Sequence, residues 1–163
     1  MIDGIKLVRV DFRLIHGQVI TKWTRTISAD RIIVVNDELA HDEFMADVYI
    51  MAAPQGMTVE VITVDDFVQH AAAGNYGNGH ILVLFKGISD AATAVGAGVA
   101  LPALQIGGLG SGGGKTSVVR GISIDRHDAD QLETIQQAGI PVSFQVTPEE
   151  QQLSLDKAVK KIR

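Results

Sequence analysis

The sequence predicts an α/β protein: a single domain with a mostly parallel central sheet, helices on both faces, and mixed strand pairing near the C-terminal part. Short runs rich in Val and Ile alternate with amphipathic stretches over the first two thirds of the chain. The composition is 46% hydrophobic but only 5% aromatic, which is typical of a buried parallel sheet. The length of 163 residues is sufficient for one core, so residues 1–163 are expected to form one domain.

The first half of the chain alternates strictly between the two kinds of element. Short apolar runs predict strands at residues 5–10, 31–35, 58–63 and 80–85, and the run within 31–35 is β-branched. Amphipathic spacing predicts helices at residues 17–27 and 39–53, the second ended by Pro54 and Gly56. Asp65 or Asp66 is expected to cap the helix after the third strand, and residues 74–79 to form a loop. Such alternation implies parallel strands joined by right-handed crossovers.

The second half of the chain begins in the same way and then changes. Ser89 is expected to cap a helix over residues 90–99, and a short fifth strand follows at 103–106. A glycine-rich loop over residues 107–114 breaks the alternation. Beyond it, residues 117–119 and 122–124 are expected to form two further strands or one bulged strand. A helix at 128–138, a strand at 142–146 and a terminal helix at 149–162 are expected to follow.

Charge and composition exclude several classes of function. The chain has 14 Lys and Arg, 19 Asp and Glu and a net charge of −5, so no general attraction to nucleic acid or anionic lipid is expected. The absence of Cys excludes disulfides, thiolate metal sites and cysteine nucleophiles. The first residues do not form a signal peptide, and the apolar stretch at 91–104 is shorter than the roughly 20 residues of a membrane span. We therefore expect a soluble, cytoplasmic protein.

Polar side chains are concentrated immediately after the first predicted strand. Asp11, Arg13, His16 and Gln18 lie within eight positions, and a helix is expected to begin near Gly17. Ligands of open α/β sheets gather beyond the carboxyl ends of the strands. Unpaired amides and the dipole at a helix start favour an anion there, and an arginine is suited to phosphate oxygens. The pattern predicts an anion site at this edge of the sheet.

A histidine facing such a site predicts phosphoryl transfer through a phosphohistidine. His16 would be the nucleophile, Arg13 would stabilise the phosphoryl charge, and Asp11 would orient the arginine or fix the imidazole tautomer. A histidine at a helix start is also commonly just a cap or a loop residue. Spacing alone leaves both interpretations open.

Residues 10–19 resemble the active-site segment of the enzyme IIB subunits in the mannose–fructose–sorbose family of bacterial sugar phosphotransferase systems. The shared string is Arg-Leu-Ile-His-Gly-Gln-Val, which begins at Arg13. Supporting similarity lies in residues 33–38, 83–86, 104–108 and 123–125. The chain departs from the family at Phe12, where an acidic or polar residue is usual, and in its glycine-rich loop at 107–114. Both departures concern the surface that partners contact.

The resemblance implies a phosphoryl relay that needs no cofactor or metal. His16 would accept the phosphoryl group from a phosphohistidine on a IIA protein or domain and pass it to a sugar bound by membrane IIC and IID subunits. The chain would then associate peripherally with the membrane, and a homo-oligomer is compatible with the resemblance. The expected catalytic residues are His16 and Arg13. The expected phosphate-binding or supporting residues are Asp11, Leu14, Gly17, Gln18, Asn36, Asp37 and Lys86.

Three of these residues follow other predicted strands at the same sheet edge. Lys86 comes after the fourth strand and either lines the phosphate pocket or is a surface lysine. Asn36 and Asp37 come after the second strand and either brace the active-site loop or cap the next helix.

The glycine-rich loop suggests a rival phosphate site. Residues 108–113 match G-x-G-x-x-G, but a strand rather than a helix is predicted next. Leu109 stands where a Walker A loop needs glycine, and Lys115 either attracts a phosphorylated partner or is solvated. The alternatives to a phosphotransferase are therefore a non-catalytic nucleotide or phospho-ligand binding module and a phosphorylation-sensing regulator. No His pair has the helical spacing of a metal site.

Overall fold

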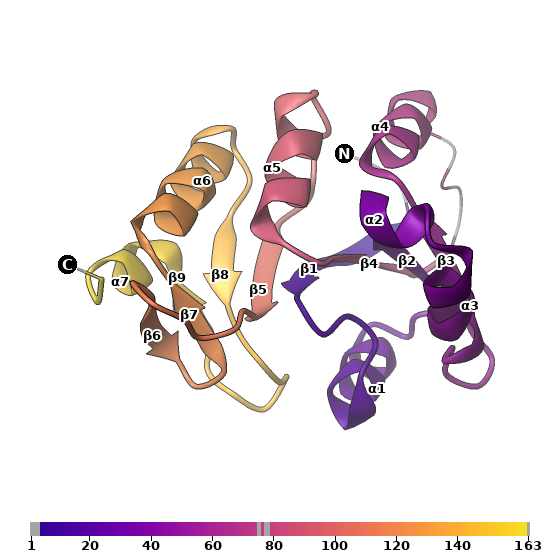
Figure 1. The fold of residues 1–163 in the computed structure, drawn as a ribbon, viewed down its shortest axis with the longest axis horizontal. Coiled ribbons are helices and arrows are strands. Elements are labelled where there is room, and N and C mark those ends of the chain that lie inside the picture. Colours follow the sequence, from indigo (N-terminus) through magenta and orange to yellow (C-terminus); the bar gives the residue numbers. More distant parts are fainter. Residues whose placement is uncertain (1–3, 75, 77–78, 163) are drawn as a thin grey trace.

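A seven-stranded sheet forms the centre of the computed structural model, which describes residues 4–74, 76 and 79–162 (Figure 1). The strand order is β3-β2-β4-β1-β5-β8-β9, and every neighbouring pair is parallel except β8 and β9. The strands of this sheet are β1 (Ile5–Asp11), β2 (Arg31–Val35), β3 (Thr58–Ile62), β4 (Ile81–Phe85), β5 (Leu104–Gly108), β8 (Val142–Phe144) and β9 (Leu153–Ser154). A separate antiparallel pair consists of β6 (Thr116–Val119) and β7 (Ile122–Ile124). The predicted α/β class, with mixed pairing near the C-terminal part, is confirmed.

Helices cover both faces of the sheet. One face carries α1 (Gly17–Thr26), α2 (Asp37–Ala40) and α3 (Glu43–Met51), and the other carries α4 (Val64–Ala73), α5 (Ile88–Gly96), α6 (Arg126–Gln137) and α7 (Leu155–Val159). Two hydrophobic clusters hold these layers together. In β2, Ile32 and Val34 enter the cluster beneath α1–α3, whereas Ile33 and Val35 enter the cluster beneath α4–α7. This alternation is the two-residue period of a strand that is buried on both faces.

Two predicted helices were wrong. The helix expected at residues 39–53 is divided into α2 and α3, because the Asp42 side chain accepts a hydrogen bond from the Met45 amide at 3.1 Å and starts a new helix. The helix expected at 149–162 is replaced by β9 and the short α7. Ser154 pairs with Ser143 of β8 and also caps α7, so the chain is still extended where a helix was expected.

Two predicted helix caps were also wrong. The Thr63 side chain caps α4 by accepting a hydrogen bond from the Asp66 amide at 3.0 Å, and Asp65 and Asp66 occupy the first turn instead. α5 begins after Gly87 without a side-chain cap, which places Ser89 inside the helix. Since Asp and Glu in a first turn complement the helix dipole, the acidic signal at α4 marked the correct end of the helix but not its capping residue.

The register of the parallel strands aligns the residues that follow them. Val10 of β1 pairs with Phe85 of β4 and with Ile106 of β5, and Phe85 pairs in turn with Val35 of β2. The segments after β1, β2 and β4 therefore leave the sheet along one edge. No helix in the described part of the chain is long and apolar enough to cross a membrane.

Candidate functional site

The chain leaves β1 through a tight loop that ends at the start of α1. The Leu14 amide donates to the Asp11 carbonyl at 3.0 Å, and the Phe12 amide donates to the Gly108 carbonyl of β5 at 3.1 Å. Leu14 has φ of 57°, a left-handed conformation that is costly for a residue with a branched side chain. Its side chain is completely buried beneath α1–α3, which holds the loop in this shape.

Asp11 is the centre of the site. Its side chain is 1% exposed and accepts hydrogen bonds from two other residues of the loop. Oδ1 accepts from the Arg13 amide at 3.0 Å and from Arg13 Nε at 3.2 Å, and Oδ2 lies 3.1 Å from Nε2 of His16. The guanidinium of Arg9 lies 3.6 Å from the same Oδ2. One buried carboxylate thus links both expected catalytic residues.

The ionisation of Asp11 determines which ring nitrogen of His16 carries the proton and which has an available lone pair. Burial by itself raises the pKa of this carboxyl, but the hydrogen bonds from the Arg13 amide, His16 and the Arg13 side chain outweigh burial and hold the pKa below its ordinary value. An ionised carboxylate only accepts hydrogen bonds, so Nε2 of a neutral His16 carries the proton. Nδ1 then has the free lone pair and is the ring nitrogen that can act as a nucleophile. The His16 side chain is 23% exposed, so a partner can reach it.

A second arginine lies behind Asp11. Arg9 is 1% exposed, and its guanidinium hydrogen-bonds the Gln105 side chain and the carbonyls of Gly107, Gln145 and Val146. Burial lowers the pKa of Arg9 to about 10, which leaves it charged at neutral pH. It was not among the expected site residues. The available signal was an arginine between the apolar residues Val8 and Val10 of a predicted strand, because a charge must be paired when it is buried.

Trp23 of α1 completes this buried layer. The Arg9 guanidinium lies 5.2 Å from the centre of the Trp23 ring, and the indole Nε1 donates to the Val146 carbonyl at 2.8 Å. The same carbonyl accepts from Arg9 Nη2 at 2.8 Å. The segment after β8 is therefore attached both to β1 and to α1 beneath the site.

The first two residues of the glycine-rich segment are required by packing against the site. A Cβ on Gly107 would collide with the Arg9 guanidinium, and a Cβ on Gly108 would lie 2.6 Å from Asp11 Oδ1 and 2.9 Å from Arg13 Nη2. A Cβ on Gly113 would meet nothing within 4 Å. The glycines at the end of β5 make room for the charged cluster, and those farther along the loop do not.

The start of α1 is suited to an anion. His16 occupies the N-cap position with no side-chain cap hydrogen bond, and the first turn contains no acidic residue. The amides of this turn and the positive end of the helix dipole are therefore available to a negatively charged group. Gly17 has φ of +47°, and a Cβ there would meet nothing within 4 Å, so the surface beside His16 is open. The side chain of Gln18 lies outside what the structure describes.

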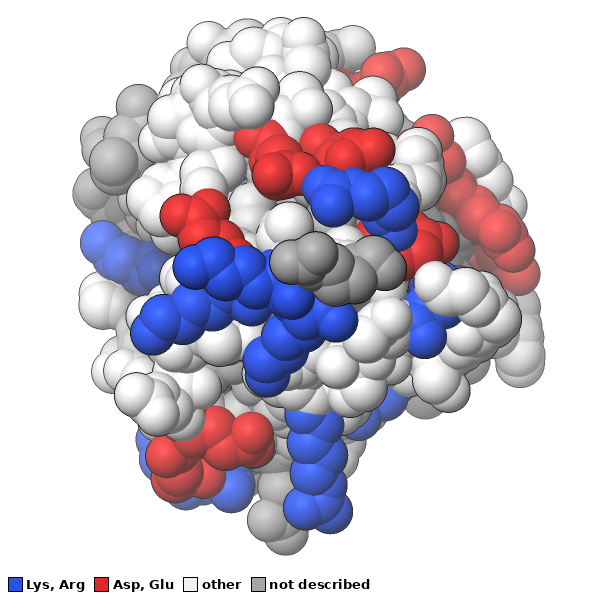
Figure 2. Space-filling model, turned by 90° about the vertical axis from the view of Figure 1, so that its left-hand side faces the viewer, with Lys and Arg blue, Asp and Glu red and all other residues white. Residues whose placement is uncertain are grey.

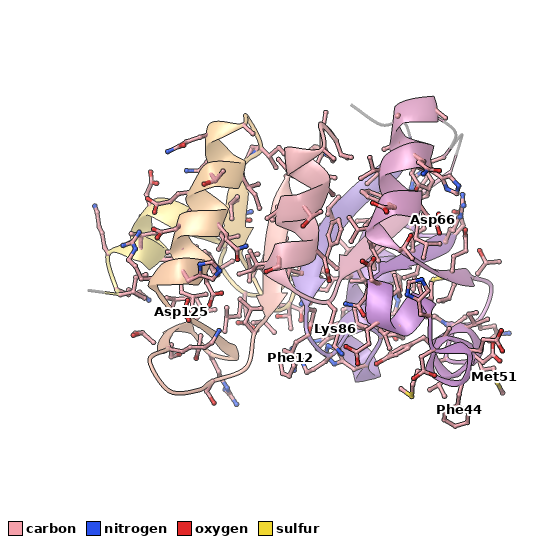
Figure 3. The ribbon with its side chains drawn as sticks, turned by 45° about the horizontal axis from the view of Figure 1, so that its top comes forward. Phe12, Phe44, Met51, Asp66, Lys86 and Asp125 are labelled. Atoms are coloured by element: carbon pink, nitrogen blue, oxygen red, sulfur yellow. The ribbon has the colours of Figure 1, made fainter. Side chains whose placement is uncertain are left out.

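Lys86, Asn36 and Asp37 lie at the same sheet edge but contact other elements. Asn36 caps α2 through the Leu39 amide at 3.0 Å and donates to Asp90 of α5 at 3.1 Å, and Asp37 accepts from the Val64 amide at 2.8 Å. Lys86 is half-buried and, within the described chain, has no hydrogen bond. Figure 3 shows it at the sheet edge that also carries Phe12. The structure thus brings together Asp11, Arg13, Leu14, His16 and Gly17. Lys86, Asn36 and Asp37 lie outside this hydrogen-bonded cluster.

The rest of the glycine-rich loop does not have the context of a dinucleotide site. It leads into strand β6, whereas that motif requires a helix whose start faces the pyrophosphate. Lys115 is paired with Asp128 at 2.9 Å. Across the described residues, no three His, Asp or Glu side chains are placed to hold a metal ion.

The chain is similar to known proteins over almost its whole length. Residues 5–163 match the family described as the PTS system sorbose subfamily IIB component. The chain is 33% identical over 154 residues to the sorbose-specific EIIB component of Klebsiella pneumoniae, covering 94% of both chains. It is 32% identical over 158 residues to the mannose-specific EIIAB component of Escherichia coli K12, covering 97% of this chain. The chain spans about half the length, 49%, of that relative.

Solved structures give the same result for the fold. The crystal structure of manxB from Thermoanaerobacter tengcongensis superposes with a TM-score of 0.91 at 30% identity, covering 98% of this chain and 97% of the other. The IIBSor domain of the sorbose permease from Klebsiella pneumoniae superposes with a TM-score of 0.88 at 32% identity, covering 96% and 97%.

Proposed function

Because the chain belongs to the IIB components of the sorbose subfamily, which transfer phosphoryl groups in sugar uptake, we propose that His16 is the residue that carries the phosphoryl group. The observation that carries this proposal is the hydrogen bond of 3.1 Å between His16 Nε2 and the buried Asp11 carboxylate. It orients the ring and leaves Nδ1 as the acceptor atom. Residues 1–163 would act as one IIB domain.

The transfer consists of two displacements at phosphorus. In the first, the lone pair of His16 Nδ1 forms a bond to phosphorus while the bond to the donor's imidazole nitrogen breaks. In the second, a sugar hydroxyl forms a bond to phosphorus while the bond to Nδ1 breaks, and the hydroxyl proton is released. In both steps Nε2 keeps its proton and its hydrogen bond to Asp11, so the charge of the phosphorylated imidazole faces a fixed carboxylate.

The remaining site residues supply charge and open space. Arg13 and the amides at the start of α1 would bind the phosphoryl oxygens, and Gly17 would leave room for them. Lys86 would reach the same oxygens from the end of β4. Asn36 and Asp37 would support this edge through α2, α4 and α5, where their hydrogen bonds lie.

IIB components act together with IIA and with IIC and IID. We propose that this chain takes its phosphoryl group from a IIA protein or domain. It would deliver the group to a sugar held by IIC and IID, working in the cytoplasm at the membrane surface.

The test is a phosphotransfer assay with radiolabelled, phosphorylated IIA as donor. The wild-type chain should gain an acid-labile phosphoryl group, and ¹⁵N NMR of the product should place it on Nδ1. His16→Ala should gain none, whereas His127→Ala, which changes an exposed histidine on α6, should behave as wild type. Undiminished labelling of His16→Ala would contradict the proposal.

A further inference from the structure

The outward face of α3 exposes large apolar side chains. Met51 is 84% exposed and Phe44 75%, and Val48 and Ile50 are each 43% exposed. Phe44, Val48 and Met51 have the i, i+4, i+7 spacing of residues along one side of a helix, and we call these three residues the α3 stripe. Figure 3 shows Phe44 and Met51 at the outer side of α3, away from the sheet. Exposed apolar residues that gather in this way typically mark an interaction site.

The opposite side of α3 is anchored in the core. Met45 and Tyr49 pack against the cluster beneath α1–α3, and Asp42 caps the helix at the Met45 amide. The α3 stripe therefore stands on a helix that is fixed in place, and a partner that covers it does not have to order it first.

The α3 stripe belongs to an acidic segment of the chain. Residues 32–85 contain eight Asp and Glu and no Lys or Arg, although the whole chain has 14 basic residues. Two of the eight, Asp65 and Asp66, lie on α4 on the other face of the sheet, and the others precede α4 in the chain. Glu43 and Asp47 lie on α3 itself and are exposed. Figure 2 shows the opposite end of the molecule, where Lys and Arg gather. A partner that fits the α3 stripe should combine an apolar surface with Lys and Arg around it.

The α3 stripe is on the same face of the sheet as the His16 loop. The hydrophobic cluster beneath α3 contains Leu14, and Ile15 packs against it. These are the two residues immediately before His16. A partner seated on α3 is therefore on the face from which α1 and the His16 loop also project.

Resting on the function proposed above, we propose that the α3 stripe is the docking surface for the cytoplasmic face of the membrane subunit that holds the sugar. Cytoplasmic loops of membrane proteins carry an excess of Lys and Arg, which complements the acidic segment around α3. The same acidic charge repels anionic lipid headgroups, so the partner is the protein and not the bilayer. Docking through α3 leaves the open surface beside Gly17 to the sugar.

The test measures the two transfer steps separately. Phe44→Ser/Met51→Ser removes the apolar stripe, and Asp47→Lys reverses a charge beside it. Both variants should accept phosphoryl from IIA as the wild type does. With membrane vesicles that contain IIC and IID, the KM for the phosphorylated chain in sugar phosphorylation should rise about tenfold or more, with kcat little changed. The KM of the wild type should rise with salt, and that of Asp47→Lys should depend on salt less.

Matched variants on the other face of the sheet serve as controls. Asp65→Lys on α4 and Gln137→Ser on α6 change exposed residues and should leave the KM unaltered. An unchanged KM in the α3 variants would refute the docking surface while leaving the role of His16 intact. If phosphorylated IIA did not label the wild-type chain, the proposed function itself would be refuted. Flotation with anionic vesicles free of IIC and IID, or a change in sedimentation of the α3 variants, would assign the stripe to lipid or to a second copy and overturn the proposal.

Discussion

Nε2 of His16 lies 3.1 Å from Oδ2 of Asp11, and this contact determines which tautomer the neutral imidazole adopts. The carboxylate is buried and held ionised by its other donors, so it can only accept from the ring. The four residues between Asp11 and His16 form the loop that joins β1 to α1. Its left-handed Leu14 turns the chain back so that a residue at the start of the helix meets one at the end of the strand.

Asp11→Asn should impair phosphoryl transfer by at least about 10²-fold. An amide can donate as well as accept, so it no longer forces the proton onto Nε2, and Nδ1 loses its lone pair in part of the population. Rapid-quench kinetics with phosphorylated IIA would measure the rate, and ¹⁵N NMR of the imidazole would measure the tautomer. Asp47→Asn on α3 should change neither. A slower rate with an unaltered tautomer would contradict this account of Asp11.

Stability should fall in acid partly because of Asp11. Its pKa in the folded protein is below the ordinary value, so its contribution is complete above the ordinary Asp pKa of about 3.9 and is lost as pH falls through the lower, folded value. Urea unfolding from pH 7 to pH 2 should show a steeper loss of unfolding free energy below pH 4 in the wild type than in Asp11→Asn. Parallel curves would show that Asp11 is not linked to folding.

Arg13→Ala should slow transfer by about 10²–10³-fold because it removes charge from the phosphoryl oxygens. The Arg13 side chain is 37% exposed, so its ion pair with Asp11 is screened and the unfolding free energy should fall by only about 1 kcal/mol. Arg13→Lys should recover part of the rate, since it keeps the charge and loses the paired geometry. Single-turnover kinetics and urea unfolding on the same preparations separate the two effects.

Gly108→Ala should disrupt the site although it adds one methyl group. The new Cβ would lie 2.6 Å from Asp11 Oδ1, so the carboxylate or β5 must move, at a cost of about 1–3 kcal/mol. Transfer to His16 should fall with it. Gly113→Ala is the matched control, because its Cβ meets nothing within 4 Å, and it should retain wild-type transfer and stability. Equal behaviour of the two variants would remove the steric argument.

Arg9→Met should lower the unfolding free energy by about 3–5 kcal/mol, because it leaves the buried Asp11 carboxylate without one of its cations and removes a donor from the carbonyls of Gly107, Gln145 and Val146. Arg25→Met, at an exposed position on α1, should change it by no more than about 0.5 kcal/mol. Urea denaturation measures both. A small effect at Arg9 would mean that the surrounding carbonyls find other donors.

The elements that could be predicted are those whose signal is local. The runs in β2 and β4 are β-branched or apolar throughout, and each is a buried central strand. The boundary between α2 and α3 was missed because the apolar pattern continues across it, while the cap at Asp42 depends on one side chain turning back to the chain. The end of the chain was predicted as one helix because its extended part is held by pairing with β8, which a local pattern does not contain.

The site residues also differ in whether their signal in the sequence is local. Asp11, Arg13 and His16 are neighbours in the sequence, so their polarity after an apolar strand was visible. Arg9 was not recognised because its partners, Gln105, Gln145 and Val146, are 96 to 137 residues away. Contacts at such separations depend on strand order, and a strand order cannot be obtained from the spacing of polar residues.

The attachment of Arg9 and Trp23 to the carbonyl of Val146 has a consequence for biosynthesis. A chain that leaves the ribosome from its N-terminus makes His16 and its loop early. Two of the carbonyl groups that accept hydrogen bonds from the buried arginine, those of Gln145 and Val146, are added only when synthesis reaches these residues. The hydrogen bonds of β1 and α1 to this segment are therefore completed late in synthesis. A prematurely ended chain would present His16 without the hydrogen bonds that Arg9 and Trp23 make to the segment after β8.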